Sequence, residues 1–267
     1  MTSTDNTELL MLDVGAAGGI TELPTLAPWL KGHAFEPRAA AARAVPQGLY
    51  RCGVVHPIAL GTTDGTAVLY VTREPCGSSL RQPDQAVAHW RGVAEKAAHG
   101  LEVLAKEAVP TIRLTTFLDR EGIDCVDYIK LDTQGTELDI LLASESALAR
   151  LSVIRMEVEF VPYYQGQALF WDIAVALTER GFRFLDLPFE ARKEDTRGRL
   201  LWGEALFYNL TPRDAARQAR VLDALGYWRE AGTPPPRSGG WRATARRTLG
   251  LLIPSYLQWR DSRRGIR

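Results

Sequence analysis

Carboxylates that end apolar runs, and glycines beside one of them, are the residues of this sequence best suited to bind a ligand. The apolar run 9–12 ends in Asp13, and a glycine-rich turn at 15–19 follows at once. A second short apolar segment, 33–37, closes with Glu36. Glycine lets a ligand approach the main chain, and a carboxylate at a strand end can accept both ribose hydroxyls of an adenosine. The two segments predict an adenosine-containing ligand; a ligand-free turn and a solvated acid are the alternatives.

A second group of acids lies in the middle of the chain. Asp132 ends another apolar run, and Glu157 and Glu159 alternate along 152–160. Alternation places the two glutamates on one face of a strand. Because carboxylates are rarely buried without a partner, they indicate a cavity or a cation, and pairing with Arg155 or another basic neighbour is the alternative. Oxygen ligands of this kind could hold Mg²⁺, which is a further hypothesis for these three acids.

The spacing of the glycines distinguishes between nucleotide ligands. The segment 13–19 reads D-x-G-x-x-G-G, which matches neither the dinucleotide pattern G-x-G-x-x-G nor the phosphate-binding pattern G-x-x-x-x-G-K-[ST]. It resembles the first motif of class I S-adenosylmethionine (SAM) methyltransferases, in which the loop faces the amino-acid end of the cofactor.

These residues need an open α/β sheet to position them, because ligands in such sheets bind beyond the carboxyl ends of the strands. Buried parallel strands appear as continuous apolar runs. The expected strands are at 9–14, 33–37, 56–61, 67–71, 112–118, 127–131, 152–160, 182–189 and 204–210. The expected helices are at 38–45, 85–108, 136–149, 168–180 and 211–229.

The last two expected strands identify the kind of sheet. Segments 182–189 and 204–210 are joined by a charged loop with no helix between them, so they pair antiparallel or lie apart. An antiparallel final strand in an otherwise parallel sheet is typical of methyltransferases, whereas a dehydrogenase would continue with another βαβ unit. Together with the resemblance of 13–19 to the first methyltransferase motif, this pattern implies a mostly parallel seven-stranded sheet of the Rossmann-like methyltransferase class, with an antiparallel last strand and helices on both faces.

Taken in order, seven segments of the chain resemble the FkbM family of SAM-dependent methyltransferases. The segments are DVGAAGG at 13–19, FEP at 35–37, ALGTTDG at 59–65, CGSSL at 76–80, TTFLD at 115–119, IKLDTQGTE at 129–137 and EVEF at 157–160. The resemblance covers about residues 9–210 and implies O-methylation, commonly of sugar or natural-product hydroxyls. One departure is Gln134, which stands where the family has Glu, and which keeps hydrogen bonding but not charge.

The resemblance also implies roles for individual residues. The implied cofactor-binding residues are Asp13, Gly15, Ala16, Gly18, Gly19, Glu36, Pro37, Ala59 and Asp132. The implied substrate-binding residues are Ser78, Ser79, Gln134 and Glu137, of which Glu137 could instead cap backbone N–H groups. Methyl transfer from a sulfonium is an in-line displacement that depends on alignment, and an alcohol acceptor gains from a base. Asp132 is the first choice for this base, and Glu157 and Glu159 come next.

Composition excludes several other classes. The chain has 267 residues, no formal net charge, 46% hydrophobic residues and three scattered cysteines. This is typical of a globular protein of a reducing cytoplasm, with no general case for nucleic-acid binding and no disulfide or zinc pattern. A small-molecule or glycan acceptor is the expected partner. A non-catalytic SAM-binding or scaffold protein and an NAD-dependent oxidoreductase are the competing functions.

The end of the chain differs in composition from the rest. We expect a methyltransferase domain at 1–210 and a helical, arginine-rich appendage at 211–267. Residues 237–267 contain eight arginines and one acid, interleaved with aromatic and aliphatic residues. Such a segment suits an anionic membrane surface, which would make the protein peripheral to the inner face of a membrane. Packing on the catalytic domain or on a second subunit of a homo-oligomer is the alternative.

Overall fold

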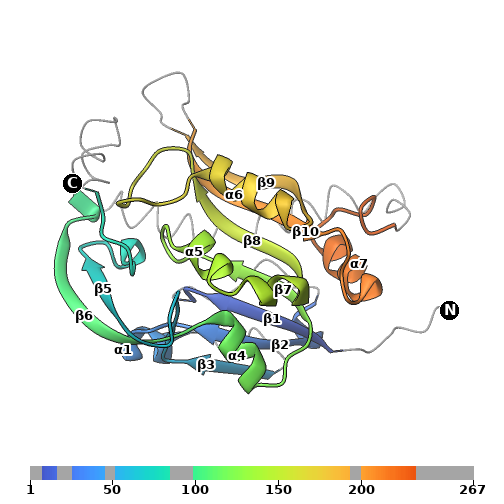
Figure 1. Ribbon diagram of the computed structural model, residues 1–267, viewed down its shortest axis with the longest axis horizontal. Coiled ribbons are helices and arrows are strands. Elements are labelled where there is room, and N and C mark those ends of the chain that lie inside the picture. The colour runs from blue at the N-terminus through green and yellow to red at the C-terminus, as the bar shows by residue number, and fades with distance from the viewer. Residues whose placement is uncertain (1–7, 17–25, 46–51, 85–98, 193–199, 233–267) are drawn as a thin grey trace.

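The computed structural model of the chain describes residues 8–16, 26–45, 52–84, 99–192 and 200–232 (Figure 1). Its main element is a seven-stranded sheet in the order β3-β2-β1-β7-β8-β10-β9. All neighbouring strands from β3 to β8 are parallel, and β10 is antiparallel to both β8 and β9. The strands are β1 (Leu9–Val14), β2 (Leu30–Phe35), β3 (Cys52–His56), β7 (Val126–Leu131), β8 (Leu151–Glu159), β9 (Phe182–Arg192) and β10 (Leu200–Asn209). This confirms the predicted class of sheet.

Helices cover both faces of this sheet. Side chains alternate along each strand, so each strand has residues that face each layer of helices. On β1, Leu10 and Leu12 face a core that α4, α5 and α6 cover, whereas Leu9 and Met11 face a second core beneath α7. The helices are α1 (Ala39–Ala44), α4 (Leu114–Arg120), α5 (Glu137–Leu142), α6 (Phe170–Glu179) and α7 (Ala215–Ala224). Short 3-10 helices lie at Ala27–Trp29, Pro75–Gly77 and Glu145–Arg150. In the described part of the chain, no helix is both long and apolar enough to span a membrane.

A second, three-stranded sheet lies beside the first (Figure 1). It consists of β4 (Ala59–Leu60), β6 (Val103–Ile112) and β5 (Gly65–Thr72), with β6 in the middle. It contacts the carboxyl edge of the large sheet, because the Ser79 hydroxyl after β5 donates to the carbonyl of Thr133 after β7, at 3.2 Å.

Several predicted elements are wrong in type or position. We predicted the third strand of the large sheet at 56–61, but that strand is β3, which ends at His56. Residues 59–60 belong to the small sheet instead. The expected helix 85–108 lies partly outside the described residues, and its end is the strand β6, which pairs with β5 along its length. The expected strand 112–118 is mainly helix α4, because Leu114, Phe117 and Leu118 share one buried helical face.

The last described helix is shorter than predicted. Helix α7 begins after Asp214, whose side chain accepts the Arg217 N–H, so the predicted residues 211–214 lie before the helix. Its residues Val221 and Leu222 are buried against the sheet. The arginine-rich segment 237–267 lies outside the described residues, so its role and the predicted domain boundary remain predictions.

Candidate functional site

The predicted acids lie in a row along the carboxyl edge of the large sheet. Strand pairing sets Val14 opposite Phe35 on one side and opposite Leu131 on the other. The next residues, Glu36 and Asp132, therefore flank the turn that follows β1. In addition, Leu131 pairs with Met156 of β8, so that Asp132 lies level with Glu157. The sheet thus brings to one edge the carboxylates of Glu36, Asp132 and Glu157, which the sequence could only place at separate strand ends.

Gly15 joins these strand ends through its backbone. Its N–H donates to the Phe35 carbonyl at 3.0 Å, and the Asp132 N–H donates to the Val14 carbonyl at 2.9 Å. Gly15 has φ of 81°, and a Cβ at this position would lie 2.0 Å from the Asp132 carbonyl oxygen. Glycine is therefore required by the contact between β1 and β7, which the sequence did not reveal, besides the predicted approach of a cofactor.

Glu36 is a buried carboxylate at the end of β2. It is 7% exposed, and its Oε1 accepts the Arg38 N–H at 3.0 Å. Burial raises the pKa of Glu36 above its ordinary value, and the hydrogen bond and charge of Arg38 oppose this. A carboxylate has about four acceptor positions, so the bond to Arg38 leaves capacity for two ribose hydroxyls.

The other implied cofactor residues divide into described and undescribed positions. Asp13 is 1% exposed and Ala16 is equally buried, whereas Pro37 is half-buried beside Glu36. Ala59 lies in the small sheet and pairs with Thr111. Gly18 and Gly19 lie outside the described residues.

Asp132 is the acid of this edge that is best placed to meet a substrate. Its side chain is 34% exposed, and its Oδ2 accepts a hydrogen bond from the Lys130 ammonium at 3.1 Å. Burial raises the pKa of Asp132, but the charge of Lys130 and the hydrogen bonds from Gln134, Lys130 and Glu157 outweigh this effect. The pKa of the carboxyl consequently lies below its ordinary value, and Asp132 is ionised at neutral pH.

Glu157 and Glu159 face the same side of β8, as alternation predicted, but differ from Asp132 in charge. Burial, followed by the charge of Asp132, raises the pKa of Glu157 well above its ordinary value. Glu159 is 3% exposed, and burial likewise raises its pKa well above the ordinary range. Glu157 and Glu159 are therefore both held toward the neutral form. Arg155, the basic neighbour on the same strand, forms its buried ion pair with Glu204 of β10.

Glu137 organises the loop between β7 and α5. Its Oε1 accepts the Thr133 N–H at 2.6 Å and the Thr133 hydroxyl at 3.0 Å, and its Oε2 accepts the Gly135 N–H at 2.9 Å. Burial raises the pKa of Glu137 to about 7 against these hydrogen bonds. These contacts favour the capping role that the sequence left open beside substrate binding.

Ser78 and Ser79 also make contacts within the protein. The Ser78 hydroxyl oxygen accepts the Thr72 N–H at 3.1 Å. Ser79 is 1% exposed, and besides donating to Thr133 it accepts the Arg81 N–H at 2.9 Å. The two serines thereby fix the small sheet to the loop after β7. The role in substrate binding that the resemblance implies for them is untested.

Gln134 connects Asp132 and Glu157. Its amide nitrogen donates to Asp132 Oδ1 at 3.0 Å and forms a short hydrogen bond to Glu157 Oε2. Its carbonyl oxygen accepts from the Tyr164 hydroxyl at 2.9 Å. Sequence reasoning missed Tyr164, which follows β8 in a segment with no motif. The sequence feature that relates to Tyr164 is the glycine at position 135, because a Cβ added there would lie 3.0 Å from the Tyr164 ring.

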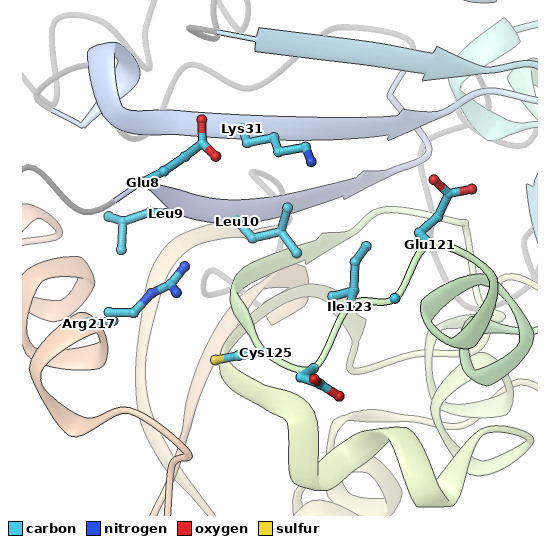
Figure 2. A pocket seen from close by; sticks show the side chains of 10 residues that line it. Glu8, Leu9, Leu10, Lys31, Glu121, Ile123, Cys125 and Arg217 are labelled. Atoms are coloured by element: carbon cyan, nitrogen blue, oxygen red, sulfur yellow. The ribbon is translucent and has the colours of Figure 1, made fainter.

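Two further features lie outside this row of acids. His56 packs against His33, Phe35 and Phe117, and burial lowers its pKa. A hollow of about 360 Å³ is lined by Leu9, Lys31, Glu121 and Arg217, among others (Figure 2). Because Leu9 begins β1, this hollow lies at the amino edge of the sheet, opposite the carboxylates.

A metal site receives no support. Within the described ranges, no group of three or more His, Cys, Asp or Glu side chains is arranged to hold a metal ion. Asp132 and Glu157 are instead bridged by an amide nitrogen, which is a hydrogen-bond donor and not a metal ligand. The arrangement of these side chains therefore does not support the predicted Mg²⁺ site at Asp132, Glu157 and Glu159.

Comparison with known proteins gives one family match. The model of the methyltransferase FkbM domain matches residues 13–184. No curated protein sequence matches the chain.

Among solved structures, 23 chains match. One is a TehB-like SAM-dependent methyltransferase from Corynebacterium glutamicum, with 10% identity, coverage of 76% of this chain and 81% of that chain, and a TM-score of 0.35. Another is magnesium protoporphyrin IX methyltransferase from Synechocystis with bound SAM, with 13% identity, coverage of 77% and 72%, and a TM-score of 0.36. A SAM-dependent methyltransferase from Methanosarcina mazei has 8% identity, coverage of 78% and 94%, and a TM-score of 0.36. Since these TM-scores are low, the fold assignment rests on the strand order and not on these likenesses.

Proposed function

The chain belongs to the FkbM family of SAM-dependent methyltransferases, and from this premise we propose that it methylates a hydroxyl group of a sugar, a glycoconjugate or a natural product. The observation that carries the proposal is the row of acids at the carboxyl edge, with Glu36 and Asp132 on either side of Gly15. This edge is where open α/β sheets bind their ligands.

The residues at this edge fit SAM. Glu36 offers a buried carboxylate for the ribose hydroxyls, and the backbone at Gly15 and Ala16 lies directly beside it. The ionised Asp132 would lie near the cofactor and provide a negative charge opposite its sulfonium. SAM, when bound, supplies a methyl group on a positively charged sulfur.

Asp132 is the residue that we assign to the proton of the acceptor. As the acceptor oxygen forms its bond to the methyl carbon, the carbon–sulfur bond breaks and leaves its electron pair on sulfur. The hydroxyl proton passes to the Asp132 carboxylate, which is ionised and 34% exposed. Glu157 and Glu159 are poorer bases at neutral pH because burial keeps their pKa values high. A positioned base of this kind contributes about 10²–10⁴-fold to the rate.

The test is methyl transfer from SAM to a panel of hydroxylated acceptors, read by mass spectrometry. The proposal expects an acceptor that gains the mass of one CH₂ group per hydroxyl, in amounts equal to the S-adenosylhomocysteine formed. SAM binding with no product on any acceptor class would favour the non-catalytic alternative.

The proposed partner of the arginine-rich segment 237–267 is an anionic membrane, which would suit a lipid-linked acceptor. Sedimentation with anionic vesicles compares the full chain with a chain that ends at Pro236. The proposal expects only the full chain to sediment. Equal, negligible binding of both chains would exclude the membrane role, and a shorter chain that lost its oligomeric state would favour packing on a second subunit.

A further inference from the structure

Both polar atoms of the Gln134 side-chain amide have hydrogen-bond partners of complementary type. Its NH₂ group meets two carboxylate acceptors, Asp132 Oδ1 and Glu157 Oε2. Its carbonyl oxygen meets the Tyr164 hydroxyl, which also lies 3.0 Å from the Gly77 carbonyl oxygen. A flipped amide would turn its oxygen toward the ionised Asp132, which has no proton to donate, so the hydrogen bond to Asp132 favours this orientation of the amide.

The backbone of Gln134 is also held in an unfavourable conformation. Its φ is 62°, and in the described part of the chain it is the one residue other than glycine with a positive φ. Glu137 fixes the N–H groups on both sides, at Thr133 and Gly135, while the Tyr164 ring packs against Gly135. Non-glycine residues keep such a conformation where the surrounding structure imposes it, and these sites are frequently functional.

We propose that Gln134 is a positioning residue: its neutral amide donates to the carboxyl groups of both Asp132 and Glu157, and the Tyr164 hydroxyl lies against its carbonyl oxygen. The amide stabilises the ionised Asp132 beside the largely neutral Glu157 without adding a charge. It thereby keeps Asp132 available as the ionised base, and in this respect the inference rests on the proposed function. The family has Glu at this position, and in this chain the amide stands in place of a third carboxyl group that would share protons with Asp132 and Glu157.

The charge environment of the amide agrees with this role. Lys130 lies beside Asp132, and burial, followed by the charge of Asp132, raises the pKa of Glu157. The titratable groups that surround the amide are Lys130 and Asp132 at the end of β7, Glu137 of α5, Glu157 and Glu159 of β8, Glu204 of β10 and Tyr164.

The first experiment measures the melting temperature (Tm) of the full chain from pH 4.5 to pH 8, and needs neither SAM nor an acceptor. The Gln134→Glu variant adds a carboxyl between two others, which raises its pKa in the folded state. Since this added carboxyl group has a higher pKa in the folded than in the unfolded state, its contribution to folding stability is retained below the unfolded-state pKa and is lost as the pH rises. The Tm difference from wild type should therefore be small at pH 4.5 and grow by roughly 3–5 °C for each unit by which the pKa is raised.

The control for this experiment is Gln134→Met, which keeps the volume of the side chain and adds no charge. The proposal expects the Tm difference between Gln134→Met and wild type to change less with pH than the Tm difference between Gln134→Glu and wild type. The proposal would be overturned if the Gln134→Glu difference were the same at pH 4.5 and pH 8. It would also be overturned if the Gln134→Met difference changed with pH as steeply as the Gln134→Glu difference.

The second experiment removes the hydroxyl that orients the amide. Tyr164→Phe keeps the ring against Gly135, so the fold should persist. With the acceptor identified by mass spectrometry, kcat should fall by roughly tenfold while the SAM dissociation constant stays within about twofold. An unchanged kcat, or a loss of SAM affinity without a loss of kcat, would contradict the positioning role. A wild-type chain that binds no SAM would instead contradict the proposed function, and the Tm experiment would still decide the role of Gln134.

Discussion

Replacing Glu36 tests the cofactor assignment at a single side chain. The carboxylate is 7% exposed at the end of β2 and already accepts the Arg38 N–H. In the proposed complex it also accepts the ribose hydroxyls of SAM. A hydrogen bond to a charged group contributes about 1.5–3 kcal/mol. Loss of one such bond in Glu36→Ala therefore weakens SAM binding by about 10- to 150-fold.

Calorimetric titration measures this effect. Glu36→Gln keeps an acceptor oxygen without the charge, so its affinity should fall between those of wild type and Glu36→Ala. A 2′-deoxy analogue of SAM should bind the wild type more weakly than SAM does, and Glu36→Ala should not distinguish the two. Glu8→Ala is the matched control, because Glu8 lies before β1 and lines the hollow at the opposite edge of the sheet.

The pH dependence of binding gives an independent check. Burial raises the pKa of Glu36 in the free protein, and the ribose hydroxyls prefer the ionised form as their acceptor. SAM affinity of the wild type should consequently fall as pH is lowered through that raised pKa, and the Glu36→Gln variant should lack this contribution. If Glu36→Ala binds SAM like wild type, or Glu8→Ala loses as much affinity, the reasoning is refuted.

Other substitutions test the rest of the site and its support. Gly15→Ala should lower the free energy of unfolding by about 1–3 kcal/mol more than Gly122→Ala, measured by urea denaturation, because both have positive φ but only Gly15 meets a backbone oxygen. Similar losses would argue against that contact. Asp132→Asn should slow methyl transfer by about 10²–10⁴-fold and keep SAM affinity; undiminished turnover would remove Asp132 as base. Arg217→Ala should cost about 2–3 kcal/mol in the same denaturation assay, because it leaves the buried Asp127 carboxylate without its ion pair, and a negligible cost would mean that α7 is not held in this way.

The strand ends of the site could be predicted because local sequence determines them. The apolar run before Asp13 is a fully buried strand, and in the strand before Asp132 every residue except Lys130 is buried, as their composition indicates. Strand β6 was missed because Ala105, Lys106 and Glu107 favour a helix, whereas pairing with β5 imposes the extended form. Local preference was overridden there by tertiary contacts.

The contacts within the site depend on distant parts of the chain. Tyr164 and Gln134 are 30 residues apart in sequence, and no local pattern pairs them. The departure at Gln134 was visible, but its meaning required the positions of Asp132 and Glu157 on neighbouring strands. Likewise, the requirement for Gly15 follows from the carbonyl of Asp132 on the adjacent strand.

The most direct test of the account is to titrate the full chain with SAM and, separately, with NAD in a calorimeter. The account predicts saturable binding of SAM and no measurable binding of NAD at the same concentrations. Binding of NAD with no binding of SAM would contradict the assignment of the carboxyl edge to a methyl donor.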